Sequence, residues 1–209
     1  MNDPKAQAAF WDERYSAEDF HFGIEPNAFL KREASRIAAQ GKVLLIADGE
    51  GRNGVFLAEQ GHSVTTTDIS PRGIAKAKRL ANMRAVTIEW REVDVLEWDW
   101  PKEEFDAVVG IFIQFAPPEA RAKMFAGMAQ ALKPGGLLLL EGYRPKQLEY
   151  ATGGPPNAEA MYTDELLLKA FENMTIDLLE CYDAEIHEGL GHSGISALID
   201  LVARKENLA

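Results

Sequence analysis

Apolar runs of strand length alternate with helix-like segments from residue 42 onward. The apolar runs predict strands over residues 43–47, 63–67, 86–91, 105–111 and 137–141. The segments between them predict helices over residues 55–60, 71–82 and 117–132. Because strands that alternate with helices are typical of βαβ units, the pattern predicts an α/β fold with a mostly parallel sheet.

Two long β-like runs close the chain, over residues 175–186 and 195–204. Only residues 188–194 separate them, so we expect these runs to pair as an antiparallel hairpin. A threonine at position 163 is expected to cap one more helix just before the hairpin.

The segments outside this pattern are also informative. Residues 4–15 and 26–40 predict two helices ahead of the first strand, each opened by a proline. Residues 142–162 are rich in glycine and proline and have no periodicity. A structureless stretch of this length is typical of a functional loop, so we expect it on the substrate side. No linker or repeat divides the chain, and we interpret residues 1–209 as one domain.

Composition limits the partners. The chain has 209 residues, 46% of them hydrophobic, and a formal net charge of -11. This acidic balance disfavours nucleic acid as a substrate, because phosphate contacts dominate that affinity. There is neither an apolar stretch of membrane-spanning length nor a signal-peptide pattern, so we expect a cytoplasmic protein with a small-molecule substrate. The oligomeric state is open between a monomer and a weak dimer.

Cysteine and histidine usage gives two further expectations. Cys181 is the single cysteine, and its apolar surroundings predict a buried core residue. The four histidines and this cysteine show no metal-ligand spacing, so no metal site is predicted.

A glycine-rich loop follows the first predicted strand directly. Its glycines, Gly49, Gly51 and Gly54, have the spacing of a dinucleotide-binding loop, which keeps an NAD-dependent oxidoreductase open as an alternative. Asp48 and Glu50 argue against that alternative, because carboxylates here would repel a pyrophosphate. They suit the sulfonium and ammonium groups of S-adenosylmethionine, which has no phosphate.

A second acidic residue, Asp68, ends the second strand about twenty residues further on. A carboxylate at this place can accept hydrogen bonds from both ribose hydroxyls of a nucleotide-like cofactor. The two features together predict an adenosine-containing cofactor, and the charge of the loop favours S-adenosylmethionine.

The order of elements resembles the class I S-adenosylmethionine-dependent methyltransferases. The motifs that match are the loop of residues 48–54, Asp68, Asp94 after the third strand, and Leu-Lys-Pro-Gly-Gly at residues 132–136. The resemblance implies a Rossmann-like, seven-stranded sheet with helices on both faces, an N-terminal helical cap over residues 1–40, and S-adenosyl-L-methionine as cofactor.

Within that fold the chain most resembles the small-molecule branch near the tellurite-resistance methyltransferases. That likeness rests on four short motifs, at residues 11–15, 23–27, 49–53 and 152–155. It implies a small acceptor such as a thiol or a chalcogen oxyanion.

The resemblance assigns cofactor contacts residue by residue. The residues expected to bind S-adenosylmethionine are Asp48, Gly49, Glu50, Gly51, Arg52, Asn53, Asp68, Ile69, Asp94, Val95 and Ile111. For Arg52 two interpretations stay open, a contact to the donor carboxylate or a surface charge. Asp94 is expected to accept a hydrogen bond from the adenine amino group, with Val95 against the ring.

The acceptor side is expected to use His192, Tyr15 and Arg144, with Arg144 favouring an anionic acceptor. Phe10 is expected to pack on the core. Gln114 stands where relatives have a histidine, and no residue is an obvious base. A binding protein that keeps the cofactor site without catalysis is therefore a further alternative.

Overall fold

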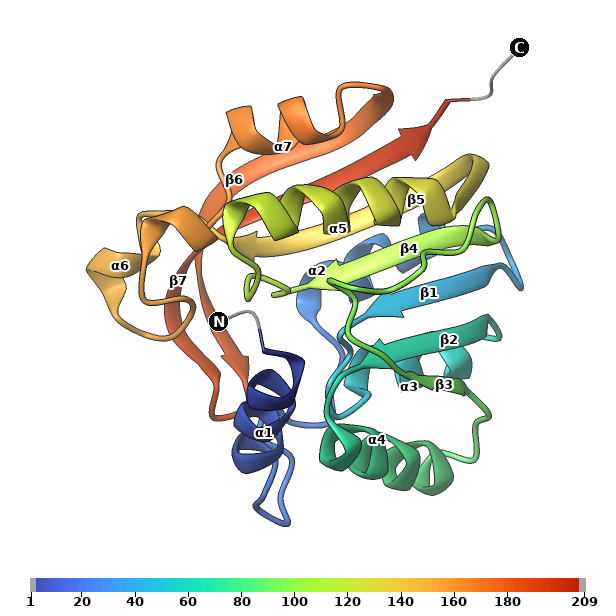
Figure 1. Ribbon diagram of the computed structural model, residues 1–209, viewed down its shortest axis with the longest axis vertical. Coiled ribbons are helices and arrows are strands. Elements are labelled where there is room, and N and C mark those ends of the chain that lie inside the picture. Colours follow the sequence, from blue (N-terminus) through green and yellow to red (C-terminus); the bar gives the residue numbers. More distant parts are fainter. Residues whose placement is uncertain (1–2, 207–209) are drawn as a thin grey trace.

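The computed structural model describes residues 3–206, which fold around one seven-stranded sheet with the strand order β3-β2-β1-β4-β5-β7-β6 (Figure 1). The strands are β1 Lys42–Ile46, β2 Ser63–Asp68, β3 Glu89–Glu92, β4 Phe105–Ile111, β5 Leu132–Tyr143, β6 Met174–Glu188 and β7 His192–Lys205. Strands β1 to β5 pair in parallel, while β7 pairs antiparallel with both β5 and β6. The predicted α/β fold class with a C-terminal antiparallel hairpin is confirmed.

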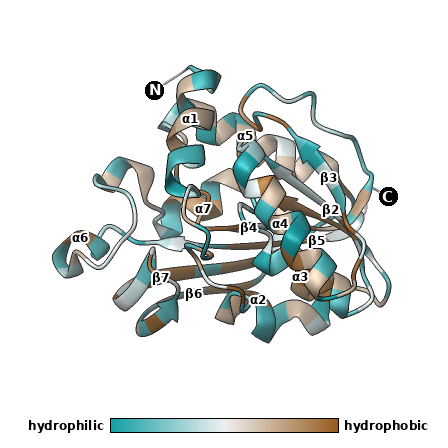
Figure 2. Ribbon diagram, turned by 90° about the horizontal axis from the view of Figure 1, so that it is seen from below, coloured by the Kyte–Doolittle hydropathy of each residue, from teal (hydrophilic) through white to brown (hydrophobic). Residues whose placement is uncertain are grey.

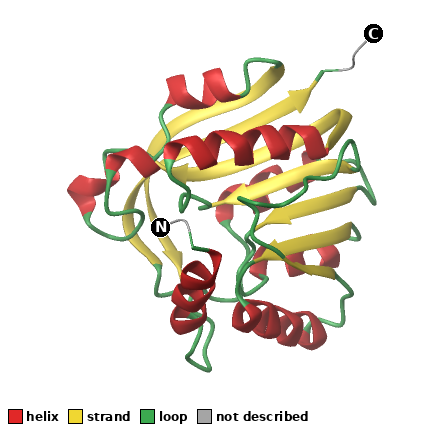
Figure 3. Ribbon diagram, in the orientation of Figure 1, coloured by secondary structure: helices red, strands yellow, loops and turns green. Residues whose placement is uncertain are grey.

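Helices cover both faces of the sheet (Figure 3). They are α1 Pro4–Arg14, α2 Ala28–Glu33, α3 Arg52–Glu59, α4 Pro71–Met83, α5 Pro118–Ala131, α6 Gln147–Tyr150 and α7 Asp164–Ala170, with the 3-10 turns η1 Ala34–Arg36 and η2 Ala158–Ala160. Helices α5 and α7 pack on one face, and α2, α3 and α4 pack on the other. None of the helices within residues 3–206 combines the length and the apolar character that crossing a membrane requires.

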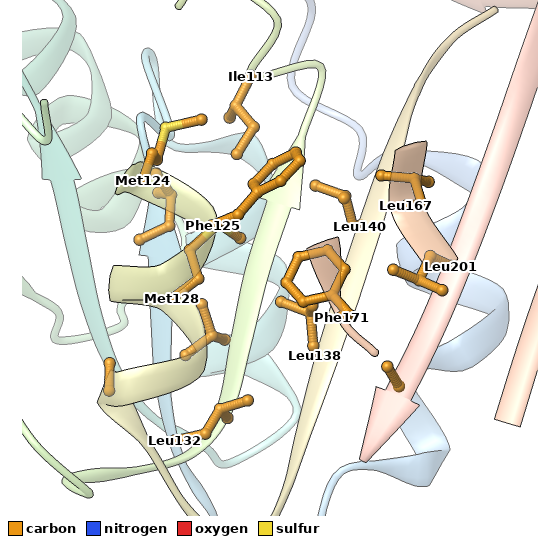
Figure 4. Packing of buried hydrophobic residues seen from close by; sticks show 14 of the residues in the cluster. Ile113, Met124, Phe125, Met128, Leu132, Leu138, Leu140, Leu167, Phe171 and Leu201 are labelled. Carbon is orange, nitrogen blue, oxygen red and sulfur yellow. The ribbon is translucent and has the colours of Figure 1, made fainter. Parts of the chain in front are cut away.

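The core forms because the central strands are apolar on both sides. In β1, Leu44 and Ile46 face the layer of α5, whereas Val43 and Leu45 face the layer of α3. Such continuous apolar runs are typical of parallel strands buried on both faces. Figure 2 shows the same distribution, with hydrophobic colours along the strands, and Figure 4 shows side chains of α5 and α7 packed against β5 and β7.

Three predicted boundaries differ from the structure. The helix expected over residues 26–40 ends early, because Ile37 takes up extended backbone and packs into the core. The third strand begins at residue 89, since the Val86 N–H still donates to Ala81 O in the turn that ends α4. The expected loop 142–162 contains the short helix α6 and the turn η2.

The expectation that Cys181 is a core residue is wrong. Cys181 is exposed, because it lies on β6, the edge strand of the sheet. One face of this strand faces solvent, as its mixed burial pattern shows. A parallel inner strand would have buried the same apolar run.

Candidate active site

A cavity of about 370 Å³ opens at the carboxyl ends of the parallel strands. It lies where β1 is flanked by β2 on one side and by β4 on the other, the place where open α/β sheets bind ligands. Of the residues expected to bind the cofactor, those that line the cavity are Asp48, Gly49, Glu50, Arg52, Asn53, Asp68, Ile69, Asp94, Val95 and Ile111.

The glycines shape the loop between β1 and α3. Gly49 and Gly51 both have positive φ, at 57° and 86°. A Cβ on Gly51 would lie 2.6 Å from the Cβ of Ala77, so Gly51 does not line the cavity and instead lets the loop pack on α4. A Cβ on Gly49 would lie 2.6 Å from the hydroxyl oxygen of Tyr15. The two glycines therefore let other residues approach the loop closely, Ala77 at Gly51 and Tyr15 at Gly49.

Asp48 is a buried carboxyl group with one oxygen unpaired. Its Oδ2 accepts a hydrogen bond from the Gly54 N–H at 3.1 Å, whereas Oδ1 has no partner within residues 3–206. Burial, as the main cause, raises the pKa of Asp48 to about 8. Because an unpaired buried carboxyl oxygen is costly, this atom is suited to accept from a cationic N–H group of a ligand.

Asp68 is fixed by the backbone at the end of β2. Its Oδ2 accepts from the Gly49 N–H and its Oδ1 from the Ser70 N–H, both at 2.8 Å. Burial raises the pKa of Asp68 to about 6, and these backbone donors oppose the rise. Each carboxylate oxygen has a second lone pair, so a pair of ligand hydroxyls can still bind here.

Asp94 follows β3 in the same manner. Its Oδ1 accepts from the Leu96 N–H at 2.9 Å, within residues 3–206 its Oδ2 forms no hydrogen bond, and Asp94 lines the cavity. Val95 beside it is buried. The carboxylates of Asp48, Asp68 and Asp94 thus stand at successive strand ends around one cavity.

Glu50 differs from these three carboxylates, because its charge is already paired. Its Oε1 forms an ion pair with Lys76 Nζ at 2.5 Å, and its Oε2 accepts from the Phe22 N–H at 3.1 Å. The charge of Glu50 is therefore used to hold the segment before β1 onto the loop.

Arg52 and Asn53 have the same holding role. Arg52 is buried, and its Nη2 donates to Glu188 Oε2 at 2.6 Å, so the interpretation of Arg52 as a surface charge is wrong. Asn53 Oδ1 accepts from the Asn27 N–H at 2.9 Å. These contacts join the loop to the end of β6 and to the start of α2.

Aromatic side chains of the N-terminal segment cover the loop. Tyr15 is buried and stacks on Trp11 with ring centroids 5.8 Å apart, and both line the cavity. Burial and the nearby carboxylates, Asp68 first among them, raise the pKa of Tyr15 well above its usual value. Phe10 is 52% exposed, so the expectation that it packs on the core is wrong. The reason is that α1 lies over the cavity and buries none of its own side chains.

His192 forms the opposite wall, at the start of β7. Its ring stacks between Phe22 and Phe112, with centroid distances of 4.7 Å and 4.2 Å, and its Nδ1 lies 2.6 Å from the Tyr143 hydroxyl. Burial, together with the positive charges of Arg52, His21 and Arg14, lowers the pKa of His192 to about 3.

Arg144 does not line the cavity, contrary to the prediction from sequence. Its guanidinium donates to Leu198 O, to Tyr182 O and to Asp183 Oδ1, on the hairpin side. Arg144 directly follows β5, and its N–H still donates to Ala197 O, so neighbours in this extended stretch point to opposite sides and Tyr143 takes the cavity side.

Comparison with known proteins shows which families and folds this chain resembles. Residues 43–136 match the family model described as a methyltransferase domain. This stretch of the chain resembles a methyltransferase domain. The matched range includes the strand ends with Asp48, Asp68 and Asp94.

Two curated relatives are methyltransferases. The chain is 30% identical over 130 residues to a phosphatidylethanolamine N-methyltransferase of Cereibacter sphaeroides, covering 61% of this chain and 63% of that protein. It is 30% identical over 146 residues to a glycine/sarcosine N-methyltransferase of Aphanothece halophytica, covering 61% and 54%. The chain therefore spans less than two thirds of the length of these relatives.

Solved structures share the fold of this chain over nearly its whole length. TehB from Haemophilus influenzae has a TM-score of 0.70 at 18% identity and covers 96% of this chain and 67% of its own. The N-methyltransferase NodS from Bradyrhizobium japonicum, in complex with S-adenosyl-L-homocysteine, has a TM-score of 0.70 at 16% identity and covers 96% and 98%. The sheet order and the hairpin thus belong to a shared architecture.

Several cavity residues are absent from the prediction. Arg14 and Phe112 line the cavity, although the sequence assigned neither of them a role. Arg14 lies within the Trp-Asp-Glu-Arg-Tyr motif, which was a usable signal. Phe112 has a positive φ of 55°, a conformation that no sequence pattern indicates for a phenylalanine.

Proposed function

We propose that this protein is an S-adenosyl-L-methionine-dependent methyltransferase that acts on a small anionic acceptor, such as a thiolate or a chalcogen oxyanion. The observation that supports it best is the buried Asp48 carboxyl, with Oδ1 unpaired, at the edge of the cavity. A cationic amine is the natural partner of such an atom. Asp68 and Asp94 add acceptors at the places where a ribose and an adenine amino group would bind.

The residues present fit the cofactor and suggest how each would act. When bound, S-adenosylmethionine supplies an electrophilic methyl group on a sulfonium. Asp48 would hold the ammonium group and Asp68 the ribose hydroxyls. Tyr15 and Trp11 would cover the loop and exclude water from the reacting atoms. The protein's part is thus mainly to align and desolvate the reactants.

The charges around the acceptor support an anionic group. The carboxylates that line the cavity within the described residues are Asp48, Glu50, Asp68 and Asp94. All of them belong to the glycine loop or to the strand ends beside it. The opposite wall, with His192 and Tyr143, has no carboxylate that would hold an ammonium substrate. The amine acceptors named for the curated relatives are therefore less well matched.

Arg14 strengthens this argument. It lines the cavity from the last turn of α1, and its guanidinium lies over the rings of Phe10 and Trp11. Within residues 3–206 no carboxylate oxygen comes within 4.0 Å of it. A cation without an ion pair at the mouth of an aromatic cavity favours an anion.

Of the two alternatives, the oxidoreductase meets specific objections. An NAD-dependent oxidoreductase would bring a pyrophosphate against Asp48, and the antiparallel β7 beside β5 is unlike the parallel sheet of that class. No such objection applies to a binding protein without catalysis, and only a measurement of methyl transfer distinguishes that protein from an enzyme.

Calorimetric titration with S-adenosylhomocysteine, with NAD as the parallel ligand, tests the cofactor assignment. We expect binding of the first and none of the second. Asp68→Ala should weaken binding about tenfold to a hundredfold, because hydrogen bonds to a charged group are lost. Asp99→Ala, an exposed aspartate of the same chemistry, is the matched control and should bind normally.

Unchanged affinity in Asp68→Ala would refute the ribose contact, and absence of S-adenosylhomocysteine binding would refute the whole proposal. Production of S-adenosylhomocysteine with a panel of thiols, chalcogen oxyanions and small acids then decides between an enzyme and a binding protein.

A further inference from the structure

The imidazole of His192 is held in one orientation by its neighbours. Phe22 and Phe112 lie on its two faces, each inclined by 23° to the ring. The Tyr143 hydroxyl lies 2.6 Å from Nδ1. Within residues 3–206, no group forms a hydrogen bond with Nε2, although His192 lines the cavity. One ring nitrogen is thus engaged by the protein and the other is left for a ligand.

The neighbours of His192 are themselves fixed. Gln114 exchanges two hydrogen bonds with the backbone of Tyr143, accepting from its N–H at 2.6 Å and donating to its carbonyl oxygen at 2.9 Å. Phe112 keeps a strained positive φ of 55° and stacks on Tyr143 as well as on His192. Backbone strain that is retained beside a cavity indicates that the arrangement has a function.

The direction of the hydrogen bond follows from the burial of Tyr143. Its ring is 1% exposed, and a buried phenolic O–H needs an acceptor. The nearby Ser196 hydroxyl donates to Gly194 O at 3.2 Å, and within residues 3–206 no hydrogen bond of 3.5 Å or less joins it to Tyr143. The remaining acceptor is Nδ1 of His192. If Nδ1 carried the proton instead, the Tyr143 O–H would lack a partner.

We propose that Tyr143 is a positioning residue that fixes His192 as the neutral tautomer with its proton on Nε2, and that this N–H binds the anionic atom of the methyl acceptor. The inference rests on the proposed function and goes beyond it, because it makes His192 a hydrogen-bond donor and not a base. The low pKa of His192, about 3, fits a ring that stays neutral at working pH.

This role fixes the chemistry of the acceptor. A donor N–H cannot remove a proton, so the acceptor must arrive with a lone pair already available. That lone pair forms the bond to the methyl carbon, and the carbon–sulfur bond breaks with its electrons going to sulfur. No proton moves in this step. Arg14, one of the cations that lower the pKa of His192, would help to hold the anion.

Nitrogen NMR of the protein labelled with ¹⁵N-histidine tests the tautomer without any ligand. We expect His192 to show a protonated Nε2 and an unprotonated, hydrogen-bonded Nδ1. Tyr143→Phe should remove the hydrogen bond to Nδ1 and produce a mixture of tautomers. Tyr162→Phe is the matched control, because the buried Tyr162 hydroxyl has no partner within residues 3–206 and does not line the cavity. A protonated Nδ1 in the wild type would overturn the proposal.

Binding to the complex with S-adenosylhomocysteine tests the acceptor. Benzoate and benzylamine are probes of similar shape and opposite charge. We expect benzoate to bind more tightly, and Tyr143→Phe to weaken benzoate about tenfold, while Tyr162→Phe leaves it unchanged. Preference for benzylamine would overturn the donor role. The tautomer of His192 is measured in the free protein, so it can be wrong while S-adenosylhomocysteine still binds. Absence of S-adenosylhomocysteine binding would instead refute the proposed function.

Discussion

At the scale of single residues, the site depends on carboxyl groups that burial keeps partly protonated. Asp48 and Asp68 follow neighbouring strands, and burial raises the pKa of the first to about 8 and of the second to about 6. Burial penalises the charged form of an acid unless a cation or donors compensate. The unpaired oxygen of Asp48 lacks that compensation, so binding of a cationic group and loss of its proton should be coupled.

The affinity for S-adenosylhomocysteine should rise as the pH rises from about 6 to about 8. The reason is that the ligand's ammonium group binds the carboxylate form of Asp48, whose pKa in the free protein is about 8. Calorimetry in buffers of different ionisation enthalpy should detect proton release on binding. Asp48→Asn should bind S-adenosylhomocysteine more weakly and release no proton on binding, while Asp99→Asn should release the proton as the wild type does. Affinity that is constant over this range, without proton release, would contradict the assignment.

At the scale of elements, α1 is attached to the fold by few contacts. The helix buries no side chain, although it supplies Trp11 and Arg14 to the cavity. Its anchor is Asp12, whose Oδ1 accepts from the Ser70 hydroxyl at 2.5 Å and from the Arg72 N–H at 3.1 Å, at the start of α4. The element that covers the cofactor loop is thus held by one carboxylate on a helix N-terminus.

Asp12→Ala should release α1 and weaken S-adenosylhomocysteine binding several-fold. The free energy of unfolding should fall by only about 1 kcal/mol, the usual scale of a lost helix cap. Limited proteolysis should cut the variant faster within the first fifteen residues. Glu13→Ala, an exposed neighbour on the same helix, is the control. Equal proteolysis and equal affinity in both variants would show that Asp12 does not anchor the helix.

At the scale of the whole molecule, a buried polar network joins the hairpin to the N-terminal segment. Glu141 and Asp200 are directly opposite in the pairing of β5 with β7. Asn27 Nδ2 donates to Glu141, and also to Glu188 at the end of β6. Burial, Asp200 and Glu188 raise the pKa of Glu141 well above its usual value. Burial raises the pKa of Asp200 as well, and the ion pair of its Oδ2 with Arg32 Nη2 at 2.7 Å opposes that rise.

Glu141→Gln should remove part of the pH dependence of stability. A carboxyl group whose pKa is raised by folding stabilises the protein at low pH, and this contribution is lost as the pH rises. Urea unfolding at pH 5 and at pH 8 measures how much the free energy of unfolding falls between these pH values. This fall should be smaller for Glu141→Gln than for the wild type. The exposed Glu149→Gln should behave like the wild type. An equal loss in all three proteins would contradict the raised pKa of Glu141.

The sequence by itself determined the fold class and the side of the cavity formed by the strand-end carboxylates. Strand periods and the glycine loop are local patterns, and the ends of parallel strands necessarily meet at one edge of the sheet. Asp48, Asp68 and Asp94 could therefore be placed together without coordinates. The ion pairs of the loop could not be predicted from sequence. Glu50 pairs with Lys76 and Arg52 pairs with Glu188, and these segments meet only in the folded chain.

The tertiary structure alone decided the acceptor side. Arg144 and Tyr143 are neighbours in sequence, and only the pairing of this stretch with β7 puts the tyrosine at the cavity and turns the arginine toward the hairpin. His192 gains its orientation from Phe22, Phe112 and Tyr143, which come from three distant segments. Long-range packing of this kind leaves no period in the sequence, because each residue is placed by neighbours that are far away along the chain.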